Sequence, residues 1–200
     1  MTVFIYVEGG GEQRFTLSAC REGFATLFAK LVPPGKLPRV IACGTRNATF
    51  DSFKIRVSHR KKGDEALLLV DSEAGVVAGT GVWAHVLAMD HWVQPPDTSD
   101  DDLHLMVQCG EAWLVADPTT LDAFYGAGFR RTALPANPDV EQVAKADVLD
   151  GLSRATKPSR RGEYHKTRHG YELLGRLDPG AVRARSSHAE RFFTTLPRVV

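Results

Sequence analysis

The 200-residue sequence contains only three cysteines, and this scarcity excludes two classes of site. Cys20, Cys43 and Cys109 lie far apart, so they do not match the closely spaced Cys/His pairs of a zinc site. Their odd number argues against a framework of disulfide bonds. We therefore expect three free thiols that pack as small apolar groups in a protein of the reducing cytoplasm.

Long apolar runs and a secretion signal are also missing. No stretch approaches the roughly 20 apolar residues that a membrane-spanning helix needs. The chain enters an apolar segment at once, without the basic residues that begin a signal peptide. Because 43% of the residues are hydrophobic and 24% are charged, the composition is ordinary for a globular protein. We expect a cytoplasmic protein without membrane contact.

The net charge of the chain is only +1, but the two signs are separated along the sequence. Residues 151–200 contain 11 Lys/Arg and 4 Asp/Glu, a net charge of +7, so residues 1–150 carry −6. An acidic front and a basic tail suit a metal site beside a phosphate-binding surface. Helices with solvated charged faces would give the same counts, and both interpretations stay open.

Short apolar runs of β type alternate with amphipathic segments along the first half of the chain. The pattern predicts strands over residues 3–8, 39–43, 66–70 and 103–108. It predicts helices over residues 16–31, 47–62 and 82–90. A β-α-β-α-β order with crossover helices implies an α/β fold with a mainly parallel four-stranded sheet, flanked by helices on its faces.

The second half of the chain is predicted to be helical. Asp117-Pro118 and Asn137-Pro138 are each typical of a helix start. Further helices are predicted over residues 139–154, 168–177 and 186–196. We therefore expect an α/β core over residues 1–117, followed by a helical, basic C-terminal extension over residues 118–200 that packs on the core.

Acidic side chains follow two predicted strands at the points where these strands end. Glu8 and Glu12 flank three glycines after the first strand, and Asp71 and Glu73 follow the third. Because the carboxyl ends of parallel strands meet at one edge of a sheet, we expect the four side chains to converge. Asp71 and Glu73 are two residues apart, so along an ideal strand they would point the same way.

Four converging carboxylates repel one another, and a bound cation is a natural reason to gather them. Carboxylate oxygens suit Mg²⁺ or Mn²⁺, and two such ions can stabilise the attacking and leaving oxygens of a phosphodiester displacement. Catalysis would lose support if the carboxyl groups of Glu8, Asp71 and Glu73 lay more than about 8 Å apart, because magnesium ligands bind at about 2.1 Å. Helix capping and solvated loops are the alternative explanation of these acids.

The acidic motifs resemble a known family. Glu8-Gly9-Gly10-Gly11-Glu12 is similar to the Glu-Gly-x-x-Glu/Asp signature of TOPRIM domains, and Asp71-Ser72-Glu73 is similar to their Asp-x-Asp motif. TOPRIM domains occur in topoisomerases, bacterial primases and nucleases. A second acidic residue four positions after the first is closest to the nuclease branch.

Further segments carry a narrower resemblance that covers nearly the whole chain. They are residues 19–24, 42–44 with Arg46, 104–108, Glu111 with Trp113, 134–138, 145–147 and 166–169. In these segments the chain is similar to a bacterial TOPRIM-like family of unknown function (DUF4276). That family is related to RloB-like proteins and is often encoded beside an ATPase in defence islands.

The resemblance implies a TOPRIM or Rossmann-like fold and a magnesium-dependent nuclease of bacterial anti-phage defence. Such a nuclease would act on DNA or RNA, with an ATPase as a candidate protein partner. Glu8 would be a metal ligand or the general base. Glu12, Asp71 and Glu73 would be metal ligands, although TOPRIM domains usually have Asp where this chain has Glu73. Glu111, on the helix after the fourth strand, would join the same site.

Basic side chains would supply the contacts to nucleic acid, and Lys166 or His169 would reach the phosphate in the transition state. Phosphate binding is predicted for Arg46, Arg154, Lys157, Arg160, Arg161 and Arg168. A solvated loop explains the basic cluster of the C-terminal segment equally well. The alternative to a nuclease is a non-catalytic TOPRIM-like module that binds a protein or a nucleic acid.

Overall fold

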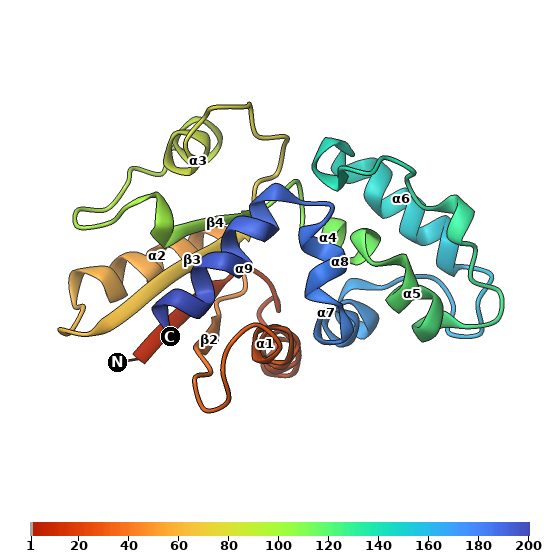
Figure 1. Ribbon diagram of the computed structural model, residues 1–200, viewed down its shortest axis with the longest axis horizontal. Coiled ribbons are helices and arrows are strands. Elements are labelled where there is room, and N and C mark those ends of the chain that lie inside the picture. Colours follow the sequence, from red (N-terminus) through yellow and green to blue (C-terminus); the bar gives the residue numbers. More distant parts are fainter. Residues whose placement is uncertain (1) are drawn as a thin grey trace.

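The structure is a computed structural model that describes residues 2–200, and its centre is a four-stranded parallel sheet in the order β2-β1-β3-β4 (Figure 1). The strands are β1 (Thr2–Val7), β2 (Arg39–Ala42), β3 (Asp64–Asp71) and β4 (Leu103–Met106). Each lies within two residues of its predicted range. The α/β fold and the parallel sheet that the sequence predicts are confirmed.

The two central strands are apolar on both faces. Ile5 of β1 and Leu69 of β3 belong to one hydrophobic cluster, whereas Tyr6 and Leu68 belong to a second one on the opposite face. Successive side chains of a strand point to opposite faces, so an apolar run without alternation indicates a sheet that is covered on both sides.

Three helices connect the strands and cover the two faces (Figure 1). They are α1 (Arg14–Ala29), α2 (Arg46–Ser58) and α3 (Val82–Asp90). Phe24 and Phe28 of α1 pack in the first cluster, and Phe50 and Phe53 of α2 pack in the second. Helix α2 ends four residues before its predicted end, so the basic residues that follow it lie in a loop.

The C-terminal half is helical, as predicted, and packs on the sheet. Its helices are α4 (Glu111–Ala116), α5 (Pro118–Tyr125), α6 (Lys145–Thr156), α7 (Tyr171–Arg176), α8 (Pro179–Arg183) and α9 (Ser187–Val199). Short helical turns are η1 (Asp100–Asp102), η2 (Arg131–Ala133), η3 (Val140–Gln142) and η4 (Lys166–Gly170), the last of π type. Helix α9 returns to pack against β4, and Phe192 of α9 shares the first cluster with Ile5 (Figure 1).

One of the two predicted helix starts is confirmed and the other is wrong. The carboxylate of Asp117 accepts a hydrogen bond from the Thr120 amide at 3.0 Å and caps α5. Asn137 instead accepts from the amide of Asp139, which closes a tight turn, and only η3 follows. Short polar side chains form such turns as readily as helix caps. Helix α6 begins later, at Lys145.

A buried carboxylate in η3 fixes the start of α9. Glu141 accepts hydrogen bonds from the hydroxyl groups of Ser186 and Ser187 at 2.6 and 3.0 Å. It also accepts from the backbone amide of His188 at 2.8 Å and from its Nδ1 at 2.9 Å. Burial raises the pKa of Glu141, but the hydrogen bonds from His188 and Ser186 outweigh burial and lower the pKa to about 2. The charged carboxylate therefore holds α9 in place.

We predict that Glu141→Ala lowers the free energy of unfolding by about 2–4 kcal/mol at pH 7, because it leaves several buried donors without an acceptor. Since the pKa is depressed in the folded state, the difference from wild type is full above the ordinary pKa of 4.5 and disappears as the pH falls toward 2. Urea unfolding at several pH values measures it. Glu172→Ala, which removes an exposed pair with Arg176, is the control and costs less than about 0.5 kcal/mol. Equal losses in both variants would contradict the role of Glu141.

Candidate functional site

The carboxyl ends of β1 and β3 bring three of the expected acids together. One carboxylate oxygen from each of Glu8, Asp71 and Glu73 lies within 4.8 Å of the other two. The strand register explains the meeting of Glu8 and Asp71, because Val7, which precedes Glu8, pairs with Leu69, two residues before Asp71. Asp71 is only 4% exposed, whereas Glu8 and Glu73 are half-buried.

Glu73 reaches the cluster by a different route from the one that strand alternation predicts. Strand β3 ends at Asp71, and Glu73 has a left-handed backbone with a φ of 64°. This conformation is uncommon for a residue with a side chain and costs about 1–3 kcal/mol, so the surroundings must hold it. The amide of Glu73 donates to the carbonyl of Gln108 at 3.0 Å, which ties the turn to the segment after β4.

Glu12, which the sequence placed in the same cluster, lies outside it and is exposed. Gly9, Gly10 and Gly11 all have positive φ angles, of 124°, 88° and 57°, and they carry the chain away from the other acids. The turn is fixed, since the Gly10 amide donates to the hydroxyl of Tyr171 at 2.5 Å. The glycines therefore do not aim Glu12 inward, and the expectation of four converging acids is corrected to three.

Glu111 lies beside this cluster, as expected, at the first position of α4. It is 4% exposed and lines one cavity together with Glu8 and Asp71. Its Oε1 accepts a hydrogen bond from the hydroxyl of Tyr164 at 3.2 Å and lies 3.5 Å from Nζ of Lys166. We call Glu8, Asp71, Glu73 and Glu111 together the acidic edge. Lys166, predicted to be catalytic, thus lies at the acidic edge with the carboxylate of Glu111 as its partner.

Lys145 is a member of the site that the sequence did not single out as functional. Its Nζ lies 2.7 Å from an oxygen of Glu73 and 3.9 Å from an oxygen of Asp71. Burial lowers the pKa of both Lys145 and Lys166, but the neighbouring carboxylates outweigh burial and raise it above the ordinary value. Both ammonium groups therefore stay charged at neutral pH. The only sequence signal for Lys145 was its place in the segment 145–147.

The electrostatics of the cluster favour protons or cations. Burial, with the negative charges of Glu8 and Glu111, raises the pKa of Asp71 to about 7, although Lys166 and Lys145 oppose the change. Burial also raises the pKa of Glu8 against the influence of Arg46. A divalent cation would replace such protons, since metal ligands bind in their deprotonated form.

Arg46 lies beside Glu8 and Asp71, and four of its five guanidinium N–H donors are bound within the protein. Its Nη1 donates to Glu8 at 3.2 Å and to the carbonyl of Asp71. Its Nε and Nη2 each donate to Asp90 at 2.7 Å, and the guanidinium lies 4.7 Å from the centre of the Trp92 ring. These contacts hold the carboxylate of Glu8 in place, and the contact of Arg46 to nucleic acid stays a prediction.

His169 and Arg161 face α5, away from the carboxylates. Nδ1 of His169 lies 3.1 Å from the hydroxyl of Tyr125, and its ring packs against Phe124. Arg161 lies over the Phe124 ring at 4.2 Å. His169 follows Lys166 by three residues on the turn η4, but it contacts Tyr125 and Phe124 whereas Lys166 contacts Glu111. The structure does not bring His169 to the cavity that holds Glu8 and Asp71.

The remaining basic residues lie on α6, in the loop after it and on η4. Arg154 forms an exposed ion pair with Asp150 at 3.0 Å. Lys157, Arg160 and Arg168 are exposed, and within residues 2–200 none of them forms an ion pair with a carboxylate. Phosphate groups can reach these three side chains without breaking an ion pair.

The family model of a domain of unknown function, DUF4276, matches residues 7–197. The chain belongs to the DUF4276 family. The matched region of this DUF4276 protein includes Glu8, Asp71, Glu73 and Glu111, the two lysines beside them and the basic residues from Arg154 to Arg168. Searches of curated proteins and of solved structures gave no significant match. Within residues 2–200, no helix of the DUF4276 chain has both the length and the apolar character needed to cross a membrane.

We predict that Asp71→Asn stabilises the metal-free DUF4276 protein at pH 8, by about 2 kcal/mol, because it removes the burial cost of a charged carboxylate. The pKa of Asp71 is raised from 3.8 to about 7 in the folded state, so this cost develops as the pH rises between these two values. The advantage of the variant is therefore full at pH 8 and absent below about pH 4. Urea unfolding in the presence of a chelator measures it, with the exposed Glu12→Gln as control. A destabilised Asp71→Asn protein at pH 8 would refute this account of the cluster.

Proposed function

We propose that this protein is a metal-dependent phosphodiesterase, a nuclease that acts on DNA or RNA with Mg²⁺ or Mn²⁺. The observation that carries the proposal is the approach of Glu8, Asp71 and Glu73 to within 4.8 Å, well inside the limit of about 8 Å beyond which catalysis would lose support. All three donors are carboxylate oxygens, the ligands that hard divalent cations prefer.

The residues of the acidic edge fit such a cation. Oxygens bound to one magnesium ion at about 2.1 Å lie roughly 3–4 Å apart, so small side-chain shifts would let Glu8, Asp71 and Glu73 share an ion. Glu111 stands close enough to raise the pKa of Asp71 and would be a further carboxylate available to such a cation. Lys145 neutralises Glu73 and Asp71 in the structure, and it would move aside or remain as an additional positive charge.

The side chains around the cluster have distinct tasks in phosphodiester hydrolysis. A bound divalent cation would polarise the phosphoryl group and lower the pKa of a water molecule. Glu8, with its raised pKa, is suited to accept a proton from the attacking water, and Arg46 holds its carboxylate in place. Lys166 stays charged beside Asp71 and Glu111 and would stabilise the negative charge of the phosphate.

The basic extension supports a nucleic acid as the substrate. Residues 151–200 carry a net charge of +7, and Lys157, Arg160 and Arg168 present exposed cationic groups. A polyanionic backbone would release its counter-ions on this surface and gain affinity at low salt. By the resemblance of its motifs to TOPRIM and RloB-like proteins, we further propose a role in bacterial defence with an ATPase partner.

A second candidate is a non-catalytic module that binds a protein. Lys145 already neutralises part of the cluster without a metal. The exposed side chains of Ile55 and Val93 line a groove on the face covered by α2, where a partner would find apolar surface. This module would show no hydrolysis with any metal.

We predict that the purified protein cleaves a labelled DNA or RNA oligonucleotide only when Mg²⁺ or Mn²⁺ is present. Glu8→Ala and Asp71→Ala should each lower the rate by at least about 100-fold, since even the partners that support a metal ligand contribute about 10–100-fold. Glu12→Ala is the matched control and should keep the wild-type rate, because Glu12 lies outside the cluster. Full activity in Asp71→Ala would contradict the role of this cluster in cleavage, whereas no cleavage by the wild type with any metal and substrate tested would favour the non-catalytic module.

A further inference from the structure

Lys145 places a positive charge beside two carboxylates of the acidic edge. Its Nζ lies 2.7 Å from an oxygen of Glu73 and 3.9 Å from an oxygen of Asp71. The two metal ions of a phosphodiesterase site typically stand about 3.5–4 Å apart and act on the same phosphate. The ammonium group of Lys145 therefore lies where a second cation would meet these two side chains.

The backbone holds Lys145 in this position. The amide of Lys145 donates to the side-chain oxygen of Gln108 at 3.2 Å, and the carbonyl of Gln108 accepts from the amide of Glu73 at 3.0 Å. One residue thus fixes both partners of the ion pair. Lys145 is also the first residue of α6, where the positive end of the helix dipole disfavours a cation. An ordinary surface ion pair needs neither feature, so the arrangement indicates a specific task for the ammonium group.

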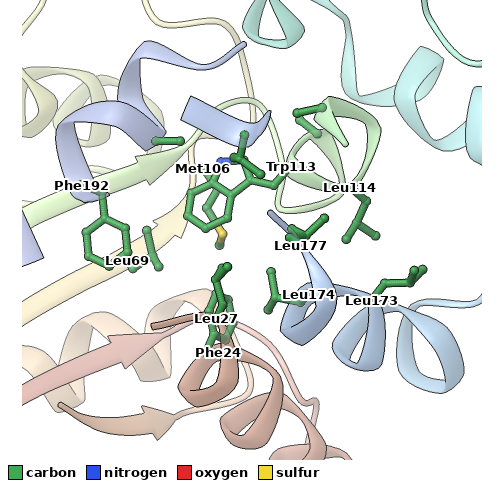
Figure 2. Packing of buried hydrophobic residues seen from close by; sticks show 14 of the residues in the cluster. Phe24, Leu27, Leu69, Met106, Trp113, Leu114, Leu173, Leu174, Leu177 and Phe192 are labelled. Carbon is green, nitrogen blue, oxygen red and sulfur yellow. The ribbon is translucent and has the colours of Figure 1, made fainter. Parts of the chain in front are cut away.

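The space beside the carboxylates is small. A cavity of about 50 Å³, lined by Glu8, Asp71 and Glu111 among others, has room for a few water molecules. Its inner wall includes four apolar side chains of the main hydrophobic core, which Figure 2 shows together: Phe24, Met106, Leu114 and Leu174. Because Mg²⁺ usually keeps several of its waters, this space suits one ion with part of its water shell, and two hydrated ions do not fit.

The charges of the site also suit one divalent cation. Three cationic side chains, those of Arg46, Lys145 and Lys166, accompany the four carboxylates of the acidic edge. When all of these groups are ionised, one negative charge is left. One divalent cation makes the site net positive, which suits a phosphate group. A second ion would add two further positive charges next to the ammonium group of Lys145, and like charges repel.

We propose that Lys145 stands in the place of a second metal ion, so that the acidic edge binds one divalent cation per chain. This inference rests on the proposed phosphodiesterase function and names the composition of its site: one metal ion with an ammonium group instead of two metal ions. The ion uses carboxylate oxygens that Lys145 does not occupy. Removing the positive charge at position 145 opens the place for a second ion.

Titration of the metal-free protein with Mn²⁺ counts the ions that bind. Calorimetry gives the number of ions per chain, and electron paramagnetic resonance shows whether two bound Mn²⁺ ions are magnetically coupled at short distance. We expect one uncoupled ion in the wild type. We expect two coupled ions in Lys145→Met, which keeps an unbranched side chain but removes its charge. Lys145→Arg keeps the charge and should bind one ion, like the wild type.

Two further variants secure the count. Lys54→Met is the matched control and should bind one ion, because Lys54 forms its ion pair with Asp51, at 2.9 Å, on the exposed surface of α2. Lys145→Gln removes the same charge with a polar side chain and decides the matter if Lys145→Met does not fold. Two ions in the wild type, or a single ion in the folded Lys145→Met or Lys145→Gln protein, however tightly bound, would overturn the inference.

Cleavage separates this inference from the function on which it rests. Metal-dependent cleavage by a wild type that binds two ions would overturn the one-ion site alone. One ion in the wild type and two in Lys145→Met, without cleavage of any oligonucleotide, would overturn the phosphodiesterase alone. No binding of Mn²⁺ by either protein would overturn both.

Discussion

The repulsion between carboxylates at the carboxyl edge of the sheet is the constraint on which the rest of the structure depends. Glu8, Asp71 and Glu73 come within 4.8 Å, and Glu111 faces the same cavity. Like charges at this distance, partly removed from water, are costly unless protons or cations accompany them. Three cationic side chains surround the group: Arg46, Lys145 and Lys166. The fold thus maintains a charged edge at the expense of its own stability, as functional sites commonly do.

The helical extension completes this edge. Lys145 is the first residue of α6, Lys166 is the first residue of η4, and Tyr164 precedes it. The amide of Lys145 donates to the side chain of Gln108 at 3.2 Å, and Gln108 also donates to the carbonyl of Glu141 at 3.3 Å. Because Glu141 fixes the start of α9, one set of hydrogen bonds joins the end of the sheet, the lysine beside the acids and the C-terminal helix.

The sequence predicted the parts of the site that follow from strand ends. Glu8 and Asp71 were found because apolar runs mark buried parallel strands, whose carboxyl ends share one edge. Glu12 was misplaced because the positive φ angles of three glycines decide where the turn leads, and composition does not reveal them.

Lys145 was missed because it is 72 residues from Glu73 in sequence, and no local pattern connects them. Arg46 shows the same limit: its type suggested a phosphate contact, whereas tertiary packing placed it between Glu8 and Asp90.

Binding of Mg²⁺ or Mn²⁺ by calorimetry, in the wild type and in a Glu8→Ala/Asp71→Ala double variant, tests the central claim that this edge is built for a divalent cation. The account predicts binding by the wild type with release of protons, and its loss in a double variant that remains folded. Unchanged binding in the double variant, or no binding in the wild type, would contradict it.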